Sequence, residues 1–230
     1  MKLQPLEILY EDNHLLVVVK PVNVPVQSDQ SGDVDLLSLI KADLKERYQK
    51  PGNVFVGLVH RLDRPVGGVM VFAKTSKGAA RLSEQIRNHE FKKEYYAVVR
   101  GTPVHQSGCL THYLKKDNAS NTVKVVEAAD PQGKQAVLDY QVRETVDGLS
   151  LVRINLQTGR AHQIRVQFAT VGTPLYGDQK YGQRINRPGE QIALWAARIK
   201  FKHPTRPEPM VFSSNPPCND YPWGLYNFKD

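Results

Sequence analysis

The stretch HRLDRPVGGVMVFAKT, residues His60 to Thr75, passes from a charged segment into an apolar run. Apolar runs lie on both sides of the charged residues, at Val54 to Val59 and at Gly67 to Lys74, and their compact hydrophobic composition is typical of inner β-strands. The segment between them, His60 to Val66, is therefore predicted to be a connecting loop. Polar loops that buried strands hold in place often carry function, so this loop is the first candidate site.

The rest of the chain alternates between helical and extended patterns. In the segment Val34 to Tyr48, apolar residues recur on one helical stripe, and Asp33 or Ser31 is available as the N-cap. Ser76 is predicted to cap a second helix. A third helix is predicted to open near Arg160, after a Thr-Gly turn. Further strands are predicted at His14 to Lys20, Glu94 to Arg100, Leu110 to Leu114, Ala136 to Arg143, Leu149 to Leu156, Ile192 to Phe201 and Met210 to Ser213. This order of elements indicates the α+β class, with an open mixed sheet and a few flanking helices.

Composition and charge limit the class of protein. The 230 residues are 40% hydrophobic, enough for one domain spanning 1–230 with a sizeable core. The run Leu15 to Val19 is too short to cross a bilayer, and no signal peptide is recognisable. Cys109 and Cys218 lie far apart without ligand-like neighbours, which argues against a disulfide scaffold or a zinc cluster. We expect a cytoplasmic protein with no membrane partner, and a monomer because no repeat or coiled-coil pattern is present.

The net charge points to a polyanionic partner. The formal charge is +8, and the lysines and arginines are spread along the chain rather than gathered in a tail. A basic folded surface attracts phosphate groups by long-range steering and counterion release. RNA, DNA and anionic lipid all fit the charge alone, so the charge by itself leaves the partner open.

The charged loop offers one carboxylate, Asp63, between the guanidinium groups of Arg61 and Arg64. Positive neighbours keep a carboxyl group ionised even when it is partly removed from water, which suits a nucleophile better than a general acid. Such a cluster is alternatively a set of surface ion pairs. A metal site built on His60, Asp63 and His162 is a further alternative, but the flanking cations disfavour it and no metal is expected.

A second cluster, LQTGRAHQIRV from Leu156 to Val166, passes from a strand through a turn into the predicted third helix. Backbone N–H groups at a helix start, together with Arg160, His162 and Gln163, would form a cradle for an anion or a phosphate. Arg165 and Arg160 project in different directions, so one could serve the substrate backbone while the other reaches a buried carboxylate. The alternative is an amphipathic helix whose arginines are merely solvated.

A third element, KKEYYAVV from Lys92 to Val99, reads as a strand with two adjacent tyrosines. Strand alternation sends Tyr95 and Tyr96 to opposite faces of the sheet, so one of them can face a site. An aromatic ring near a basic groove is suited to stacking on an unpaired base. Adjacent tyrosines in strands are also common as core or interface residues, and that alternative stays open.

Four motifs occur in the order in which they occur in the RluA-type RNA pseudouridine synthases, and the chain resembles that family from near Ile8 to Pro204. The motifs are HRLDRPVGGVMVFAKT (His60 to Thr75), KKEYYAVV (Lys92 to Val99), LQTGRAHQIRVQ (Leu156 to Gln167) and PLYGDQKYG (Pro174 to Gly182). The resemblance implies the family's pseudouridine synthase fold, a long mixed, largely antiparallel sheet with flanking helices and a central catalytic cleft. It also implies an isomerase that converts uridine to pseudouridine in RNA without a cofactor.

Carried over residue by residue, the resemblance makes Asp63 the nucleophile, Tyr95 the ring that stacks on the target uracil, and Arg165 the partner of the aspartate. Arg61 resembles the arginine associated with base flipping in this family, and Tyr95 is a candidate base for the C5 proton. We expect ribosomal RNA, preferably of the large subunit, as the substrate, with transfer RNA as the alternative. The remaining expected substrate-binding residues are His60, Arg64, Arg160, His162 and Gln163.

Two departures from the family pattern concern the target more than the reaction. The family commonly has Thr-Ser where this chain has Val66-Gly67, and commonly has Thr and His where Ala161 and Gln167 stand. Lost hydroxyl groups change turn hydrogen bonds and substrate preference rather than the nucleophile. The small S4-like RNA-binding module of several relatives is expected to be missing, so the basic surface of the catalytic domain would bind RNA. The competing hypothesis is a non-catalytic RNA-binding protein on the same fold.

Overall fold

The computed structural model describes residues 6–228, which form two compact units. The first unit consists of the described residues up to Lys92 together with Ala196–Ser214. The second consists of Lys93–Trp195 together with the described residues from Asn215 onward. The chain passes between the units three times, within strands at Lys92–Lys93 and Trp195–Ala196 and outside any strand at Ser214–Asn215. The prediction that residues 1–230 form a single domain stays a prediction.

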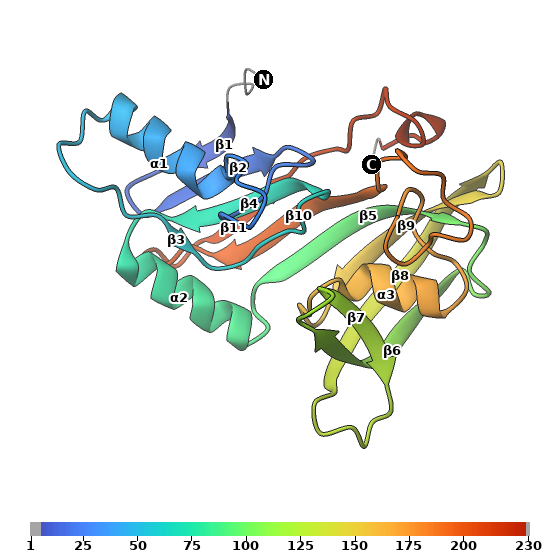
Figure 1. Cartoon of the computed structure of the whole chain (residues 1–230). Helices are drawn as coiled ribbons and strands as arrows, with labels where there is room; N and C mark the ends of the chain where they lie inside the picture. The colour runs from blue at the N-terminus through green and yellow to red at the C-terminus, as the bar shows by residue number, and fades with distance from the viewer. Residues whose placement is uncertain (1–5, 229–230) are drawn as a thin grey trace. The chain divides into compact units, whose positions relative to one another are not determined.

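The first unit consists of antiparallel strands and two helices, α1 (Leu36–Arg47) and α2 (Ser76–Arg87) (Figure 1). The strand order is β1-β2-β4-β10, with β3 paired to β4 and β11 paired to β10. The described pairings of β1 with β2, β2 with β4, β3 with β4 and β10 with β11 are all antiparallel. The strands are β1 (Glu7–Glu11), β2 (Leu15–Lys20), β3 (Gly57–Leu58), β4 (Gly67–Ala73), β10 (Leu194–Lys202) and β11 (Pro209–Ser213).

The core of the first unit gathers apolar side chains from β2, β4, α2 and β10. Val17 and Val71 pair across β2 and β4, and Leu82 of α2 packs into the same cluster. Phe91 and Phe201 stack with ring centroids 5.2 Å apart. Burial of each such side chain stabilises the fold by about 1.5–3 kcal/mol. All of β2 is buried, so its unbroken apolar run has no solvent-facing position, as the sequence predicts.

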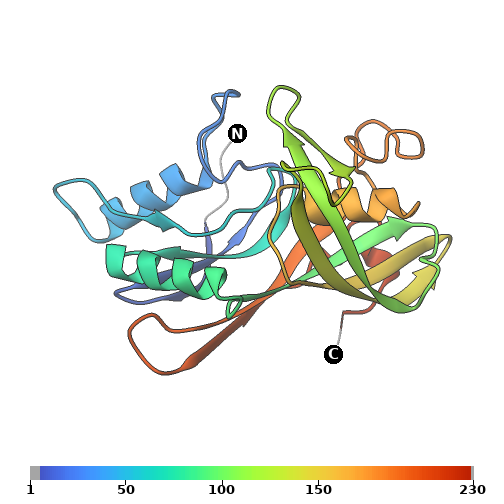
Figure 2. The same ribbon diagram turned by 90° about the horizontal axis from the view of Figure 1, so that it is seen from below.

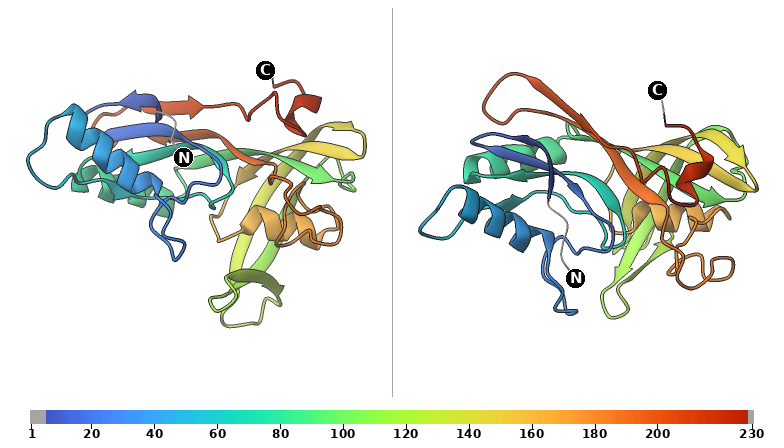
Figure 3. Two further views of the ribbon diagram at one scale, coloured as in Figure 1. Left: turned by 45° about the horizontal axis from the view of Figure 1, so that its top comes forward. Right: turned by 90° about the horizontal axis from the view of Figure 1, so that it is seen from above.

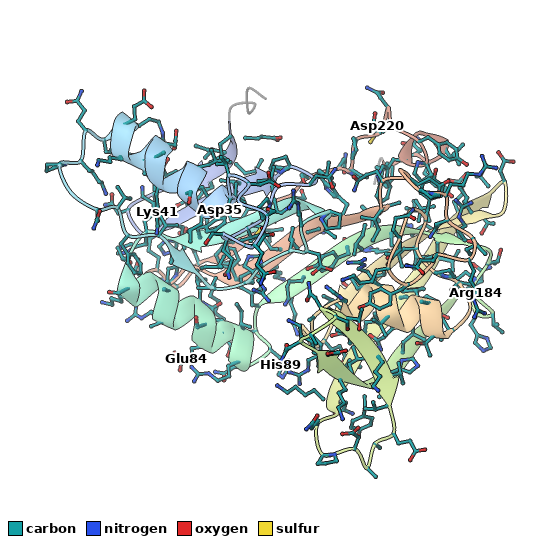
Figure 4. All side chains as sticks on the ribbon, viewed as in Figure 1. Asp35, Lys41, Glu84, His89, Arg184 and Asp220 are labelled. Atoms are coloured by element: carbon teal, nitrogen blue, oxygen red, sulfur yellow. The ribbon has the colours of Figure 1, made fainter. Side chains whose placement is uncertain are left out.

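The N-caps of the two helices of the first unit differ from those predicted. The carboxylate of Asp35 accepts a hydrogen bond from Ser38 N (3.0 Å) at the start of α1 (Figure 4), so the predicted caps Asp33 and Ser31 are wrong. Thr75 caps α2 by accepting from Gly78 N (3.1 Å), one residue before the predicted Ser76. In both cases the cap is the residue whose oxygen reaches the free N–H three positions later.

The second unit is an antiparallel sheet with the strand order β5-β9-β8-β6-β7. The long β8–β9 hairpin is yellow in Figure 3, and α3 (Gln163–Thr170) lies beside β7 and β6 (Figure 2). Phe168 of α3 is fully buried against Tyr140 of β8, with ring centroids 5.6 Å apart. The strands are β5 (Lys92–Arg100), β6 (Ser107–Asp117), β7 (Thr122–Val126), β8 (Lys134–Val146) and β9 (Leu149–Leu156), and a short 3₁₀ turn, η1, spans Trp223–Leu225.

These elements confirm the α+β class and correct three details of the prediction. The third helix does not open near Arg160, because His162 adopts a left-handed conformation (φ 51°) that cannot continue a helix, and α3 begins at Gln163. The predicted strand from Val54 to Val59 is reduced to the two residues of β3. The strands β1 and β7 were not predicted. Among residues 6–228, no helix is long and apolar enough to cross a membrane.

Candidate active site

The charged loop lies between β3 and β4 of the first unit, and it places Asp63 half-buried with Arg61 and Arg64 exposed. Leu62 anchors the loop in the interior, and Val66 N donates to the Asp63 carbonyl (3.0 Å) to close a turn. The loop therefore presents one carboxylate from a fixed backbone. Its position is set by buried neighbours rather than by the exposed arginines.

Gly68, directly after this loop, can only be glycine. Its φ is +118°, and a Cβ built there would lie 2.3 Å from the carbonyl oxygen of Ala196 in β10. The absence of a side chain lets β4 approach β10 closely as the chain leaves the loop.

A buried lysine that the sequence analysis missed supports the loop from the end of β2. Lys20 is fully buried, and its ammonium group donates to the carbonyl oxygens of Pro21 (2.9 Å), Arg64 (3.0 Å) and Val66 (2.7 Å). An ammonium group has three N–H donors, so these three acceptors satisfy it completely. Lys20 thus fixes the backbone on the C-terminal side of Asp63.

Lys20 is also coupled to Asp63 electrostatically. Burial lowers the pKa of Lys20 to about 7, and the negative charge of Asp63 acts in the opposite direction. The three carbonyl acceptors also favour the protonated amine, since only the ammonium form can donate to all of them. The sequence signal is a lysine that ends an otherwise apolar run just before a proline.

The side chains next to Asp63 are engaged with the protein in different ways. His60 Nε2 accepts from Val71 N (3.1 Å), which requires the neutral ring with its proton on Nδ1, and the ring packs beside Phe91. Arg64 donates to Asn23 O (3.2 Å) and forms an ion pair with Asp33. The ion-pair alternative raised from the sequence therefore describes Arg64, and His60 supports β4. Their substrate-binding roles stay predictions.

In the second unit, Arg165 is buried against a carboxylate that the sequence analysis did not single out. Arg165 Nε and Nη2 donate to the two oxygens of Asp178 at 2.9 and 2.8 Å, and the guanidinium lies 5.2 Å from the ring centre of Tyr181. Burial alone would raise the pKa of Asp178, but hydrogen bonds from Arg165 and from the N–H groups of Lys180 and Tyr181 hold it below its usual value. This bidentate pair fixes the orientation of Arg165.

Tyr181 connects this pair to His162. Its hydroxyl oxygen accepts from Val123 N (2.9 Å) and lies 2.6 Å from His162 Nδ1. His162 thus lies beside the residues that hold Arg165, at the cap position of α3. Asp178 and Tyr181 both belong to PLYGDQKYG, a motif that was recognised by its sequence but given no roles.

Gln163 and Arg160 organise the turn before α3. Gln163 is buried, and its amide oxygen accepts from Thr158 Oγ1 (2.8 Å) and Arg160 N (3.0 Å) while its nitrogen donates to Val137 O (3.1 Å). Arg160 is exposed and donates from Nε to Gln135 O (2.9 Å). The hydrogen bonds of Gln163 therefore serve the turn itself, and substrate binding by either residue stays a prediction.

Tyr95 lies on the face of β5 opposite to Tyr96, as the alternation predicts. It is buried and pairs with Ile154 of β9, whereas Tyr96 pairs with Arg153 and packs against Phe228 at 5.2 Å. Because successive residues of a strand point to opposite faces, only Tyr95 shares the face of Ile154. Within residues 6–228, no group of three or more His, Cys, Asp or Glu side chains is arranged to hold a metal ion.

Comparison with known proteins decides the family. Residues 14–170 match the family model described as RNA pseudouridylate synthase. The chain belongs to this family. It is 33% identical over 224 residues to ribosomal large subunit pseudouridine synthase D of Zymomonas mobilis, covering 93% of this chain and 70% of the relative. It is 34% identical over 209 residues to an uncharacterized RNA pseudouridine synthase of Bacillus subtilis, covering 90% and 67%.

Solved structures agree on the fold of this pseudouridine synthase. Human RNA pseudouridylate synthase domain containing 4 superimposes with a TM-score of 0.76 at 22% identity, covering 92% of this chain and 88% of that chain. The resemblance drawn from the four sequence motifs is confirmed, as is the assignment of the enzyme as an isomerase acting on RNA. The chain spans about two thirds of the length of the curated relatives it matches.

The supporting role of Lys20 predicts a measurable effect on stability. Lys20→Met removes the three hydrogen bonds to the loop and leaves three carbonyl groups without their donor, so the free energy of unfolding is expected to fall by about 2–4 kcal/mol. Denaturant unfolding measures this change. Lys41→Met, at an exposed position on α1 (Figure 4), is the matched control and should alter stability by less than about 0.5 kcal/mol. Equal stability of both variants would show that Lys20 does not hold the loop.

Proposed function

We propose that this pseudouridine synthase isomerises specific uridines in large-subunit ribosomal RNA, with Asp63 as the nucleophile. The observation that carries the nucleophile assignment is the half-buried carboxylate on a loop whose backbone is fixed by the buried ammonium group of Lys20. The choice of RNA rests on the relatives, several of which are named ribosomal large subunit pseudouridine synthases C and D. A monomeric state and a cytoplasmic location stay predictions.

The reaction rearranges bonds within one nucleotide and needs no net donor or acceptor. The N1–C1′ bond of uridine breaks, the detached uracil turns, and C5 joins C1′ while the C5 proton leaves and N1 gains one. Before this, the nucleotide is flipped out of its stack at a cost of a few kcal/mol. Asp63 as a carboxylate either attacks C1′ or assists formation of a glycal, and both routes require its ionised form.

The other groups have supporting roles in this proposal. Tyr95 stacks on the target uracil from a rigid strand, which suits a ring that must keep the detached base in place. Arg165 is held in one orientation by Asp178, and the resemblance assigns it to the catalytic aspartate. Arg61 is exposed on the loop of Asp63 and is assigned to base flipping. Binding of the uridine, its orientation and the reaction itself are thus assigned to residues of three different sequence motifs.

The test of the proposed function is pseudouridine mapping by carbodiimide modification and primer extension on total RNA. A strain that lacks the gene is compared with strains rescued by the wild type or by Asp63→Asn. A primer-extension stop in large-subunit ribosomal RNA that disappears in the deletion strain and returns only with the wild type supports the proposal. A stop lost from transfer RNA would correct the substrate. Persistence of every stop would favour the non-catalytic RNA-binding alternative.

Tyr95→Phe separates stacking from proton transfer. The variant keeps the ring and loses the phenol, so RNA affinity should stay within a few-fold of the wild type. If the phenol removes the C5 proton, tritium release from [5-³H]uridine-labelled RNA falls by about 10²–10⁴-fold. We expect this fall, and quench-flow tritium release measures it. An unchanged rate would restrict Tyr95 to stacking.

A further inference from the structure

Lys93 shares a sheet face with Tyr95 and has no role in the mechanism above. It is the second residue of β5, where it pairs with Leu156 of β9, two residues along the strand from the pairing of Tyr95 with Ile154. Residues two apart in a strand point to the same face and lie roughly 7 Å apart. The amine of Lys93 therefore projects from the face that carries the ring proposed to stack on the target base.

The amine of Lys93 lies against Gly159 in the turn before α3. A Cβ built at Gly159 would be 2.9 Å from Lys93 Nζ, a contact that the flexible end of the lysine side chain would relieve by shifting. Gly159 does not have a positive φ, so its backbone conformation does not demand glycine. The amine of Lys93 thus lies directly against the backbone of Gly159, in the space that a side chain would otherwise occupy.

Within residues 6–228, the amine of Lys93 makes no hydrogen bond and no ion pair. Burial lowers the pKa of this amine, and no nearby charge contributes to the shift. The neighbouring Glu94, on the opposite face, is paired with Arg153 at 2.5 Å. A half-buried ammonium group without an acceptor costs free energy, and proteins keep such groups where a ligand completes them.

We propose that Lys93 binds a phosphodiester group of the RNA strand next to the uridine that stacks on Tyr95. The inference rests on the proposed function, since it places the target nucleotide at Tyr95. A phosphate supplies the missing acceptor and the opposite charge together. It also suits the turn, because Gly159 leaves one side of the amine uncovered by any side chain and the adjacent Arg160 is an exposed cation. Lys93 is thus a positioning residue for the RNA backbone rather than a group that reacts.

The test compares Lys93→Met with Lys92→Met, an identical change at the exposed neighbouring residue of the same strand, and with Lys93→Arg. The substrate is RNA from the deletion strain, which still contains the unmodified target. For Lys93→Met we expect kcat/KM to fall about 10- to 100-fold through KM, in line with one lost charged contact. The slope of log kcat/KM against log salt concentration should become shallower by about one. Lys93→Arg should keep the wild-type slope.

The thermal unfolding midpoint of Lys93→Met distinguishes RNA binding from a structural role of Lys93. Lys93→Met removes a half-buried charge without a partner, so its unfolding midpoint should equal or exceed the wild-type value by a few degrees. A lower midpoint would identify Lys93 as part of the fold and overturn the inference. A reduced kcat/KM with an unchanged salt slope would identify a contact with a neutral uracil oxygen instead of a phosphate and would overturn the inference. An equal change of slope in Lys92→Met would overturn it as well. A wild type without activity on this RNA would instead refute the proposed function.

Discussion

Asp63→Asn is expected to form no pseudouridine while binding its RNA within a few-fold of the wild-type affinity. The amide is nearly isosteric with the carboxylate but has neither the negative charge nor the nucleophilic oxygen that both routes at C1′ require. The loop should keep its shape, because Lys20 holds it through backbone carbonyls rather than through the Asp63 side chain. Tritium release measures turnover, and filter binding measures affinity.

The matched control for this variant is Asp33→Asn. Asp33 is an exposed carboxylate that forms an ion pair with Arg64 near the same loop, so its replacement removes one negative charge without touching the nucleophile. Exposed ion pairs contribute only about 0–1 kcal/mol, and turnover should stay close to the wild-type rate. Residual turnover in Asp63→Asn together with a large loss of affinity would reassign Asp63 to RNA binding.

Asp178→Asn is expected to lower the free energy of unfolding by about 3–5 kcal/mol, because it leaves the buried guanidinium of Arg165 without a counter-charge. The folded-state pKa of Asp178 lies below the unfolded value of 3.8. Its contribution is therefore complete above that value and is lost as the pH falls through the folded pKa. The stability difference between wild type and variant should stay constant near neutral pH and shrink in strong acid. Urea unfolding at several pH values measures it.

Turnover should also fall in Asp178→Asn, since Arg165 loses the partner that orients it. Arg165→Lys keeps the charge but loses the two-point contact with Asp178, and a severe rate defect is expected there as well. Glu190→Gln is the control, because Glu190 forms a comparable pair with Arg100 in the same unit (2.8 Å). That variant should lose stability and keep its rate. Wild-type turnover in Arg165→Lys would remove Arg165 from the reaction.

Strands with continuous apolar runs were predictable from the sequence. The limits of β2 and β4 differ from the prediction by one residue each, because burial on both faces leaves a run that no helix period imitates. The limits of β9 match the prediction, although polar residues interrupt its apolar pattern. The strand β7 (Thr122–Val126) was missed because it is a short hairpin arm, mostly outside the core. The start of α3 was missed because the left-handed conformation of His162 has no sequence signature.

The candidate site was predictable where the motifs carried chemistry and not where tertiary contacts did. Asp63, Tyr95 and Arg165 were selected from the motifs that contain them. Lys20 was missed because its role depends on carbonyl groups more than forty residues away in the chain. Asp178 was missed for a related reason, since its importance appears only when the fold brings it to Arg165.

Lys20 links the position of the charged loop to the electrostatic environment of Asp63. Lys20 sets where the loop lies, through its carbonyl contacts, and its charge acts on the carboxylate that the loop carries. A substitution that moves the loop to suit a new RNA would therefore also alter the electrostatic interaction between Lys20 and Asp63. Adaptation to new targets is then easiest at a distance from the loop, for example at the exposed tip of the β6–β7 hairpin near Asp117. The chemistry would stay fixed while target choice diversified.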